Sequence, residues 1–103
     1  MRAVAIAGTV LALAAAGTSH AANQKRSSAA AAWASGSFAQ CVRMRESTDG
    51  RGSSNLYGML PSTWASVGGR GYSGDAPRAE QDYRAFLLYQ RAGVGPWRPY
   101  DGC

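Results

Sequence analysis

Histidine and cysteine are almost absent from this chain of 103 residues, which carries one histidine, His20, and two cysteines, Cys41 and Cys103. His20 falls in a predicted leader segment, so we expect the processed protein to contain no histidine. A chain without histidine has no Ser–His or Cys–His dyad, and two cysteines alone do not make a conventional zinc site. We therefore expect no metal and no cofactor. Carboxyl groups are left for acid–base chemistry, and glycosidic bond cleavage is the leading reaction that one carboxyl group can carry.

Residues 1–21 have the pattern of a secretory signal peptide. Arg2 supplies a positive charge near the start, residues 3–16 are uncharged and rich in alanine, and Ser19 and Ala21 are small residues at the two positions that a signal peptidase reads. The apolar run is short for a membrane span, which makes a retained anchor the weaker alternative. We predict cleavage near Ala21, a processed chain of roughly 82 residues, secretion to the cell wall and no stable membrane insertion.

The charge balance of the processed chain is basic. Without Arg2, ten Lys and Arg residues stand against six Asp and Glu residues, a net charge of about +4. In an exported protein this balance suits anionic wall polymers or membrane surfaces, and ordinary solubility explains it equally well. The arginines are scattered, so no nucleic-acid-binding stripe is predicted. Mixed charges on the predicted helix faces make a membrane-active cationic factor a less favoured class.

Cys41 and Cys103 are predicted to form a disulfide bond. An exported chain meets an oxidising compartment, and a domain of this size has a limited core and commonly needs a covalent cross-link. The bond would close a loop of about 62 residues, worth roughly 4 kcal/mol in the chain-entropy model. A free reactive pair is the minor alternative, because neither cysteine lies in a Cys-x-x-Cys motif.

The remaining sequence predicts one mainly helical domain over residues 36–103. It follows residues 22–35, which we expect to be a flexible lead-in, with helix formation through their alanines as the alternative. Three helices, separated by glycine-rich loops, are predicted over residues 38–47, 61–67 and 75–92. Ser37 and Gln40 have the spacing of a capping box at the start of the first helix. The last helix is expected to bury an apolar stripe formed by Ala79, Tyr83, Phe86 and Leu87.

Glu46 is the best-placed acid. On a helical wheel it borders a stripe formed by Phe38, Cys41, Val42 and Arg45. Partial burial there raises the pKa of a carboxyl group, and the C-terminal end of a helix disfavours the carboxylate further, whereas Arg43 and Arg45 favour it. A solvated Glu46 paired with Arg43 is the alternative. Arg45, inside the stripe, should pair with an acid or backbone carbonyls, or extend its charged head to solvent.

Several motifs in order resemble the lysozyme-like domain of secreted transglycosylase-like proteins and resuscitation-promoting factors of high-GC Gram-positive bacteria. They are Arg45-Glu46-Ser47 at a helix end, the Tyr57-Gly58 segment, Pro61-Ser62-Thr63-Trp64, and Pro96-Trp97 before Cys103. The resemblance covers roughly residues 36–103 and implies a small α+β lysozyme-like fold. It also implies cleavage of the β-1,4 bond between N-acetylmuramic acid and N-acetylglucosamine in peptidoglycan, with Glu46 as the catalytic acid.

Substrate contacts are expected from Tyr57, Trp64 and Tyr72, whose rings can stack on sugars, and from Asn55. Trp64 has a core position as its stronger alternative. The family's segment often carries a cleft-lining glutamine where this chain has Gly58, so a catalytically weak protein that binds wall glycan is the competing interpretation. We expect a monomer whose partners are peptidoglycan glycan strands. Asp49 is the other acid near Glu46 and a weak candidate for a nucleophile.

Overall fold

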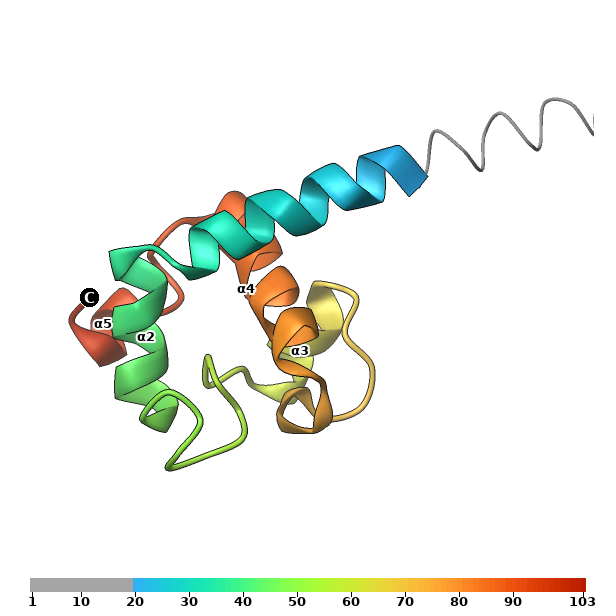
Figure 1. Ribbon diagram of the computed structural model, residues 1–103. Helices are drawn as coiled ribbons and strands as arrows, with labels where there is room; N and C mark the ends of the chain where they lie inside the picture. The colour runs from blue at the N-terminus through green and yellow to red at the C-terminus, as the bar shows by residue number, and fades with distance from the viewer. Residues whose placement is uncertain (1–19) are drawn as a thin grey trace, which may run out of the picture.

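The computed structural model describes residues 20–103, and within that range the protein consists of helices and loops (Figure 1). A helix over residues 20–34 precedes α2 (Ser37–Ser47), α3 (Pro61–Ser66), the 3₁₀ helix η1 (Ser73–Asp75), α4 (Arg78–Ala92) and α5 (Arg98–Asp101). The mainly α prediction is confirmed. Residues 20–103 contain no strand, so the expected α+β character is not seen, and their helices outnumber the three predicted.

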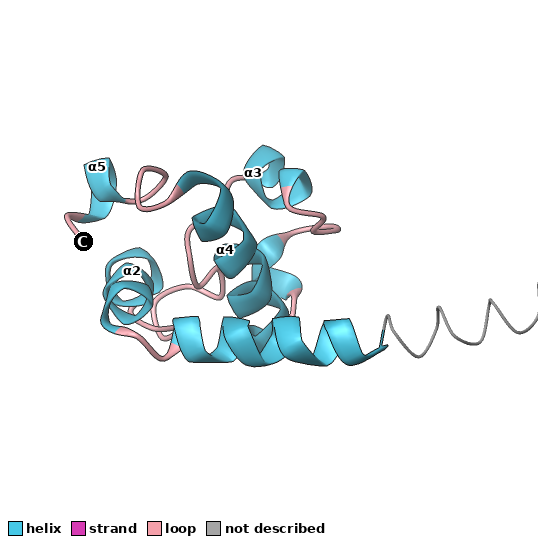
Figure 2. Cartoon of the chain, turned by 90° about the horizontal axis from the view of Figure 1, so that it is seen from above, coloured by secondary structure: helices cyan, strands magenta, loops and turns pink. Residues whose placement is uncertain are grey.

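The 20–34 helix occupies the segment for which we expected a flexible lead-in. It runs across one side of the molecule past α4 (Figure 2). Ala30 and Ala34 are buried, and the ring of Trp33 stacks on Tyr57 with centroids 5.8 Å apart. The alanine-rich composition therefore gives a helix whose last turns form part of the core, ahead of the expected domain start at residue 36. The predicted leader lies almost entirely outside the described residues.

The α2 helix ends at Ser47 as predicted, but its start and buried face differ from the predictions. The predicted capping box is wrong: Gly36 is the N-cap without a side-chain bond, and the Gln40 amide donates instead to the Ser35 carbonyl at 2.7 Å. The buried face is formed by Ala39, Val42, Arg43 and Ser47. Arg45, expected inside the buried stripe, is exposed, because α2 turns toward the core the face that carries these four residues.

A buried polar side chain also determines which face of α4 is turned toward the core. Gln81, Ala85 and Leu88 are buried, whereas Ala79 is exposed, so the predicted stripe is rotated from the observed one. The Gln81 amide donates to the carbonyls of Ser54 and Ala76, and its Oε1 accepts from the Leu56 backbone N–H at 2.9 Å. A polar residue thus anchors the irregular segment 48–60 to α4. Apolar periodicity cannot predict this, because the partners lie on the loop rather than on the helix.

The tail of the chain folds back onto α2. The short α5 helix packs against α2, and the predicted disulfide between Cys41 and Cys103 is present, with Cα atoms 6.0 Å apart. Trp97, buried at the start of this tail, donates its indole N–H to the Tyr57 carbonyl at 3.0 Å. These contacts join the two ends of the domain around one core. No helix between residues 20 and 103 combines the length and apolar character needed to cross a membrane.

Candidate functional site

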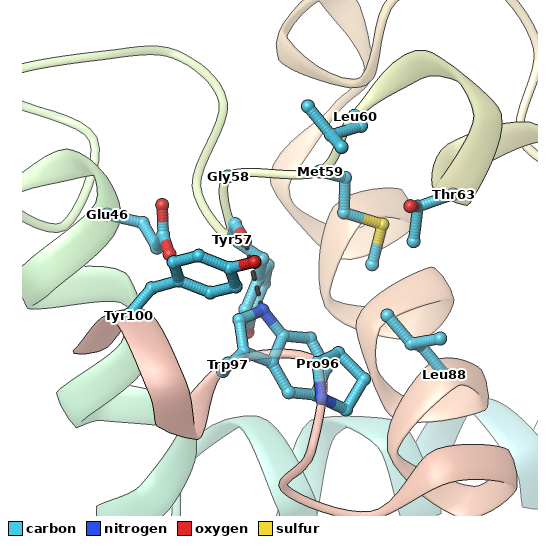
Figure 3. Close-up of a pocket in the computed structure, with 10 residues that line it drawn as sticks. All are labelled: Glu46, Tyr57, Gly58, Met59, Leu60, Thr63, Leu88, Pro96, Trp97 and Tyr100. Atoms are coloured by element: carbon cyan, nitrogen blue, oxygen red, sulfur yellow. Dashed lines mark hydrogen bonds between the residues drawn. The ribbon is translucent and has the colours of Figure 1, made fainter. Parts of the chain in front are cut away.

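Glu46 lines a cavity of about 400 Å³ that lies between α2, α4 and the C-terminal tail (Figure 3). This volume is within the range of clefts that bind small ligands, about 300–1,000 Å³. The wall is formed by Glu46, Tyr57, Gly58, Met59, Leu60, Thr63, Leu88, Pro96, Trp97 and Tyr100. Of these described residues, Glu46 alone carries a carboxyl group. The cavity is therefore largely apolar, with one acid at its edge.

The position of Glu46 raises the pKa of its carboxyl group to about 7, from an ordinary value of 4.5. Burial is the largest cause, and a hydrogen bond and like charge from the Asp101 carboxyl add to it. The direction agrees with the sequence prediction. Of the two arginines expected to oppose the shift, Arg43 donates to other groups and Arg45 is exposed. With a pKa of about 7, a substantial fraction of Glu46 is protonated near neutral pH. A group of this kind can donate a proton at physiological pH.

Gly58 gives the Glu46 carboxyl its space. A Cβ atom at residue 58 would overlap the Oε1 atom of Glu46, and Gly58 has a backbone φ of 64°, in the region that favours glycine. Gly58 is thus in contact with the candidate catalytic acid. In this backbone a side chain at residue 58 and the observed position of Glu46 exclude one another.

Arg43 holds the base of the site together from its buried position on α2. Its guanidinium donates to the Asp49 carboxylate at 3.0 Å, to the Ala34 carbonyl at 2.9 Å and to the Tyr57 hydroxyl at 2.7 Å. The Tyr57 hydroxyl in turn donates to Asp82 at 2.6 Å. One side chain therefore links α2 to the 20–34 helix, the 48–60 segment and α4, and it fixes the helix that carries Glu46.

Asp49, the weaker acidic candidate, does not line the cavity. Arg78 donates to it at 2.7 Å in addition to Arg43, and these bonds, the one from Arg78 foremost, hold its pKa below the ordinary value. An ionised carboxylate engaged by two guanidinium groups is a poor nucleophile, because attack would cost both bonds. Its place in the structure is that of an ion-pair partner.

The four predicted substrate-binding residues are not brought together. Tyr57 lines the cavity, but the residue is only 1% exposed and its ring stacks on Trp33. Trp64 is buried and donates its indole N–H to the Arg70 carbonyl. It therefore has the core position that was the alternative to substrate contact. Tyr72 is exposed and is not part of the cavity wall.

Asn55, the fourth of these residues, hydrogen bonds to the backbone of the cavity wall. Its Oδ1 accepts from the Met59 backbone N–H at 3.1 Å and from the Ser73 hydroxyl at 2.5 Å. Its amide N–H donates to the Met59 carbonyl at 3.0 Å. With these groups occupied, Asn55 acts on the site by fixing the backbone of Met59, which lines the cavity.

Sequence reasoning missed Tyr100 and Asp101, the residues that α5 contributes. Tyr100 is 85% exposed at the cavity edge, and the Asp101 carboxyl is, after burial, the second cause of the raised pKa of Glu46. The positions of the two cysteines could have predicted that these residues lie near Glu46. A bond between Cys41 and Cys103 necessarily places the last residues of the chain beside the helix that carries Glu46.

The described residues contain no group of three or more His, Cys, Asp or Glu side chains arranged to hold a metal ion. Comparisons of the chain with models of protein families, with curated proteins and with solved structures find no match. The chemistry of the cavity is therefore the basis for a functional assignment.

Proposed function

We propose that this protein is a secreted peptidoglycan-cleaving glycosidase or lytic transglycosylase that acts on the bond between N-acetylmuramic acid and N-acetylglucosamine through Glu46. One observation carries the proposal: a carboxyl group with a pKa of about 7 lies at the edge of a cavity of about 400 Å³. A glycosidase needs an acid that is still protonated near neutral pH to protonate the leaving oxygen. The resemblance of the sequence motifs to the lysozyme-like domain is the second support.

In the proposed reaction Glu46 first donates its proton to the glycosidic oxygen as the bond to the muramic C1 breaks. The resulting carboxylate then accepts a proton from the muramic C6 hydroxyl, which attacks C1 to give a 1,6-anhydro sugar. If water attacks instead, Glu46 accepts its proton and a reducing end is formed. The substrate's own acetamido group can assist at C1, so no second protein carboxylate is required.

The walls of the cavity suit the apolar faces of sugar rings. Leu60 and Tyr100 are 67% and 85% exposed beside it, and Pro96 and Trp97 form its floor (Figure 3). Exposed apolar side chains that gather at a cavity commonly mark a binding site. An aromatic ring with a polar tip, as in Tyr100, fits a ligand that has both apolar faces and hydroxyl groups.

A wall-glycan-binding protein with weak or no activity is the second candidate. It is favoured by the small number of polar side chains in the cavity. Among the described lining residues, N–H, O–H or carboxyl groups on the side chain are found in Glu46, Tyr57, Thr63, Trp97 and Tyr100. Of these, Trp97 is already engaged by the Tyr57 carbonyl, and the Tyr57 hydroxyl by Arg43 and Asp82. Few groups remain to hold a sugar in a reactive orientation.

The test is digestion of purified peptidoglycan by the wild-type protein, by Glu46→Gln and by Asp49→Asn. We expect soluble muropeptides from the wild type and from Asp49→Asn, and at least 100-fold less from Glu46→Gln, because a general acid contributes about 10²–10⁴-fold. Mass spectrometry identifies the ends: anhydro products indicate a transglycosylase and reducing ends a hydrolase. If the wild type binds several wall preparations but releases nothing, the binding candidate replaces the enzyme.

A further inference from the structure

Asp101 is a second acid at the site and is not part of the reaction proposed above. It is the last residue of α5, and the disulfide formed by Cys103 fixes it beside α2. Its Oδ2 atom is buried, and no N–H or hydroxyl group of the residues that the structure describes donates to it. A buried carboxylate oxygen without a donor is costly, so this atom requires an explanation.

We propose that Asp101 is a positioning residue that shares one proton with Glu46, so that the disulfide-bound tail keeps the acid of the cavity protonated. Two carboxylates cannot donate to one another, and a hydrogen bond between the two groups forms only when one of them is protonated. With the proton on Glu46, the Asp101 carboxylate gains a donor. The two partly buried groups then carry one negative charge between them rather than two.

The charged groups around the pair leave this arrangement undisturbed. On α2, Arg43 is engaged by Asp49, Tyr57 and the Ala34 carbonyl, and Arg45 is exposed. Neither contributes to the pKa shift of Glu46, for which burial and Asp101 are the causes.

The other elements packed against Glu46 add no competing charge. On α5, Arg98 and Tyr100 are exposed. On the segment after Asn55, the one titratable side chain is Tyr57, whose pKa burial and the Asp82 carboxylate hold above its ordinary value, so it stays neutral. Gly58 has no Cβ atom and so leaves room for Oε1 of Glu46 at its observed position.

The close approach of the two carboxyl groups excludes a role for Asp101 as nucleophile or as base. Carboxyl groups of retaining glycosidases are about 5–5.5 Å apart, and those of inverting enzymes about 6.5–9.5 Å, which leaves room for the sugar or a water. A hydrogen bond between a carboxyl and a carboxylate brings their oxygens to about 2.5–2.7 Å. No sugar carbon fits between them, and Asp101 acts through Glu46.

The proposal is tested by NMR titration of the Glu46 carboxyl carbon in wild type, Asp101→Asn and Asp101→Ala, with Asp75→Asn as the charge-matched control. Asp75 is exposed and outside the cavity wall. We expect a midpoint near 7 for the wild type and the control. We expect lower midpoints in both Asp101 variants, still above 4.5 because burial, the larger cause, remains.

The titration does not depend on enzyme activity, so it separates this proposal from the proposed function. Although the role of Asp101 in catalysis rests on that function, the shared proton does not. If the wild type releases muropeptides, the alkaline limb of its pH profile should move to lower pH in Asp101→Asn by the shift seen in the titration. A Glu46 midpoint that is the same in wild type and in folded Asp101→Ala would overturn the proposal, whatever the activity.

Discussion

At the scale of single residues, Glu46 has a cost for the folded state that follows from its position. Its pKa of about 7 in the folded protein lies above the ordinary value of 4.5 for an exposed carboxyl. A group whose pKa is raised on folding contributes stability that is fully present below the unfolded value and is lost as the pH rises through the folded value. The free energy of unfolding should therefore fall between about pH 4.5 and pH 7 because of this one residue.

Glu46→Gln should consequently be more stable than the wild type above neutral pH, by on the order of 1–2 kcal/mol after allowance for partial exposure. The amide removes the partly buried negative charge beside Asp101. Thermal unfolding at pH 5 and pH 8.5 measures the effect, and the gain in Tm should be larger at pH 8.5. If the difference in Tm between the two proteins is the same at pH 5 and pH 8.5, folding does not raise the pKa of Glu46.

Gly58 is the second residue whose effect can be isolated. Gly58→Ala should strain the backbone, move the Glu46 carboxyl and lower muropeptide release at least tenfold, because a Cβ atom there would overlap Oε1 of Glu46. Gly71 has the same φ of 64°, and a Cβ atom added to it would meet nothing within 4 Å, so Gly71→Ala is the matched control for strain alone. Both variants should lose about 1–2 kcal/mol of stability. Equal activity of the two variants would remove the role given to Gly58.

At the scale of elements, the 20–34 helix is divided between an exposed part and a part that belongs to the core. Residues 20–29 are mostly exposed, whereas Ala30, Trp33 and Ala34 pack against the rest of the protein. Trp33 contacts the rings of Phe86 and Tyr89 as well as Tyr57. The Ala34 carbonyl also accepts a bond from Arg43, so the last turns of this helix support the helix that carries Glu46.

A chain that starts at residue 26 should therefore be as stable as one that starts at residue 22, within about 0.5 kcal/mol. A chain that starts at residue 36 loses Trp33 and should be destabilised by about 3–5 kcal/mol, the usual cost of removing a large aromatic side chain from a core. Urea unfolding of the three chains measures this. Equal midpoints for all three would mean that the helix contributes nothing to the fold.

At the scale of the whole molecule, the disulfide joins the tail to α2 and closes a loop with a sequence separation of 62 residues. The chain-entropy model assigns such a loop roughly 4 kcal/mol, a large share of the stability of a small domain. Cys41→Ser with Cys103→Ser should lower Tm by more than about 10 °C and loosen α5, so the Glu46 titration midpoint should fall with it. A double variant with unchanged Tm and midpoint would contradict the role given to the cross-link.

The features that follow from simple periodicity and cysteine chemistry could be predicted from the sequence, whereas the buried polar contacts could not. The end of α2, the disulfide and the partial burial of Glu46 follow from local pattern and cysteine count. Arg43 and Gln81 were missed because their burial depends on partners 5 to 39 residues away, such as Asp82 and Ser54. Hydrophobic patterning treats such residues as surface. Asp101 was missed for the same reason, although the disulfide brings it to the site.

The most direct test is the pH dependence of muropeptide release by the wild-type protein between pH 4.5 and pH 9, measured as kcat/KM. Because the acid must be protonated before the bond breaks, the rate should fall above about pH 7, with a midpoint equal to that of the Glu46 NMR titration. The glycosidase proposal is contradicted if release is independent of pH across this range, or if its midpoint differs from that of Glu46.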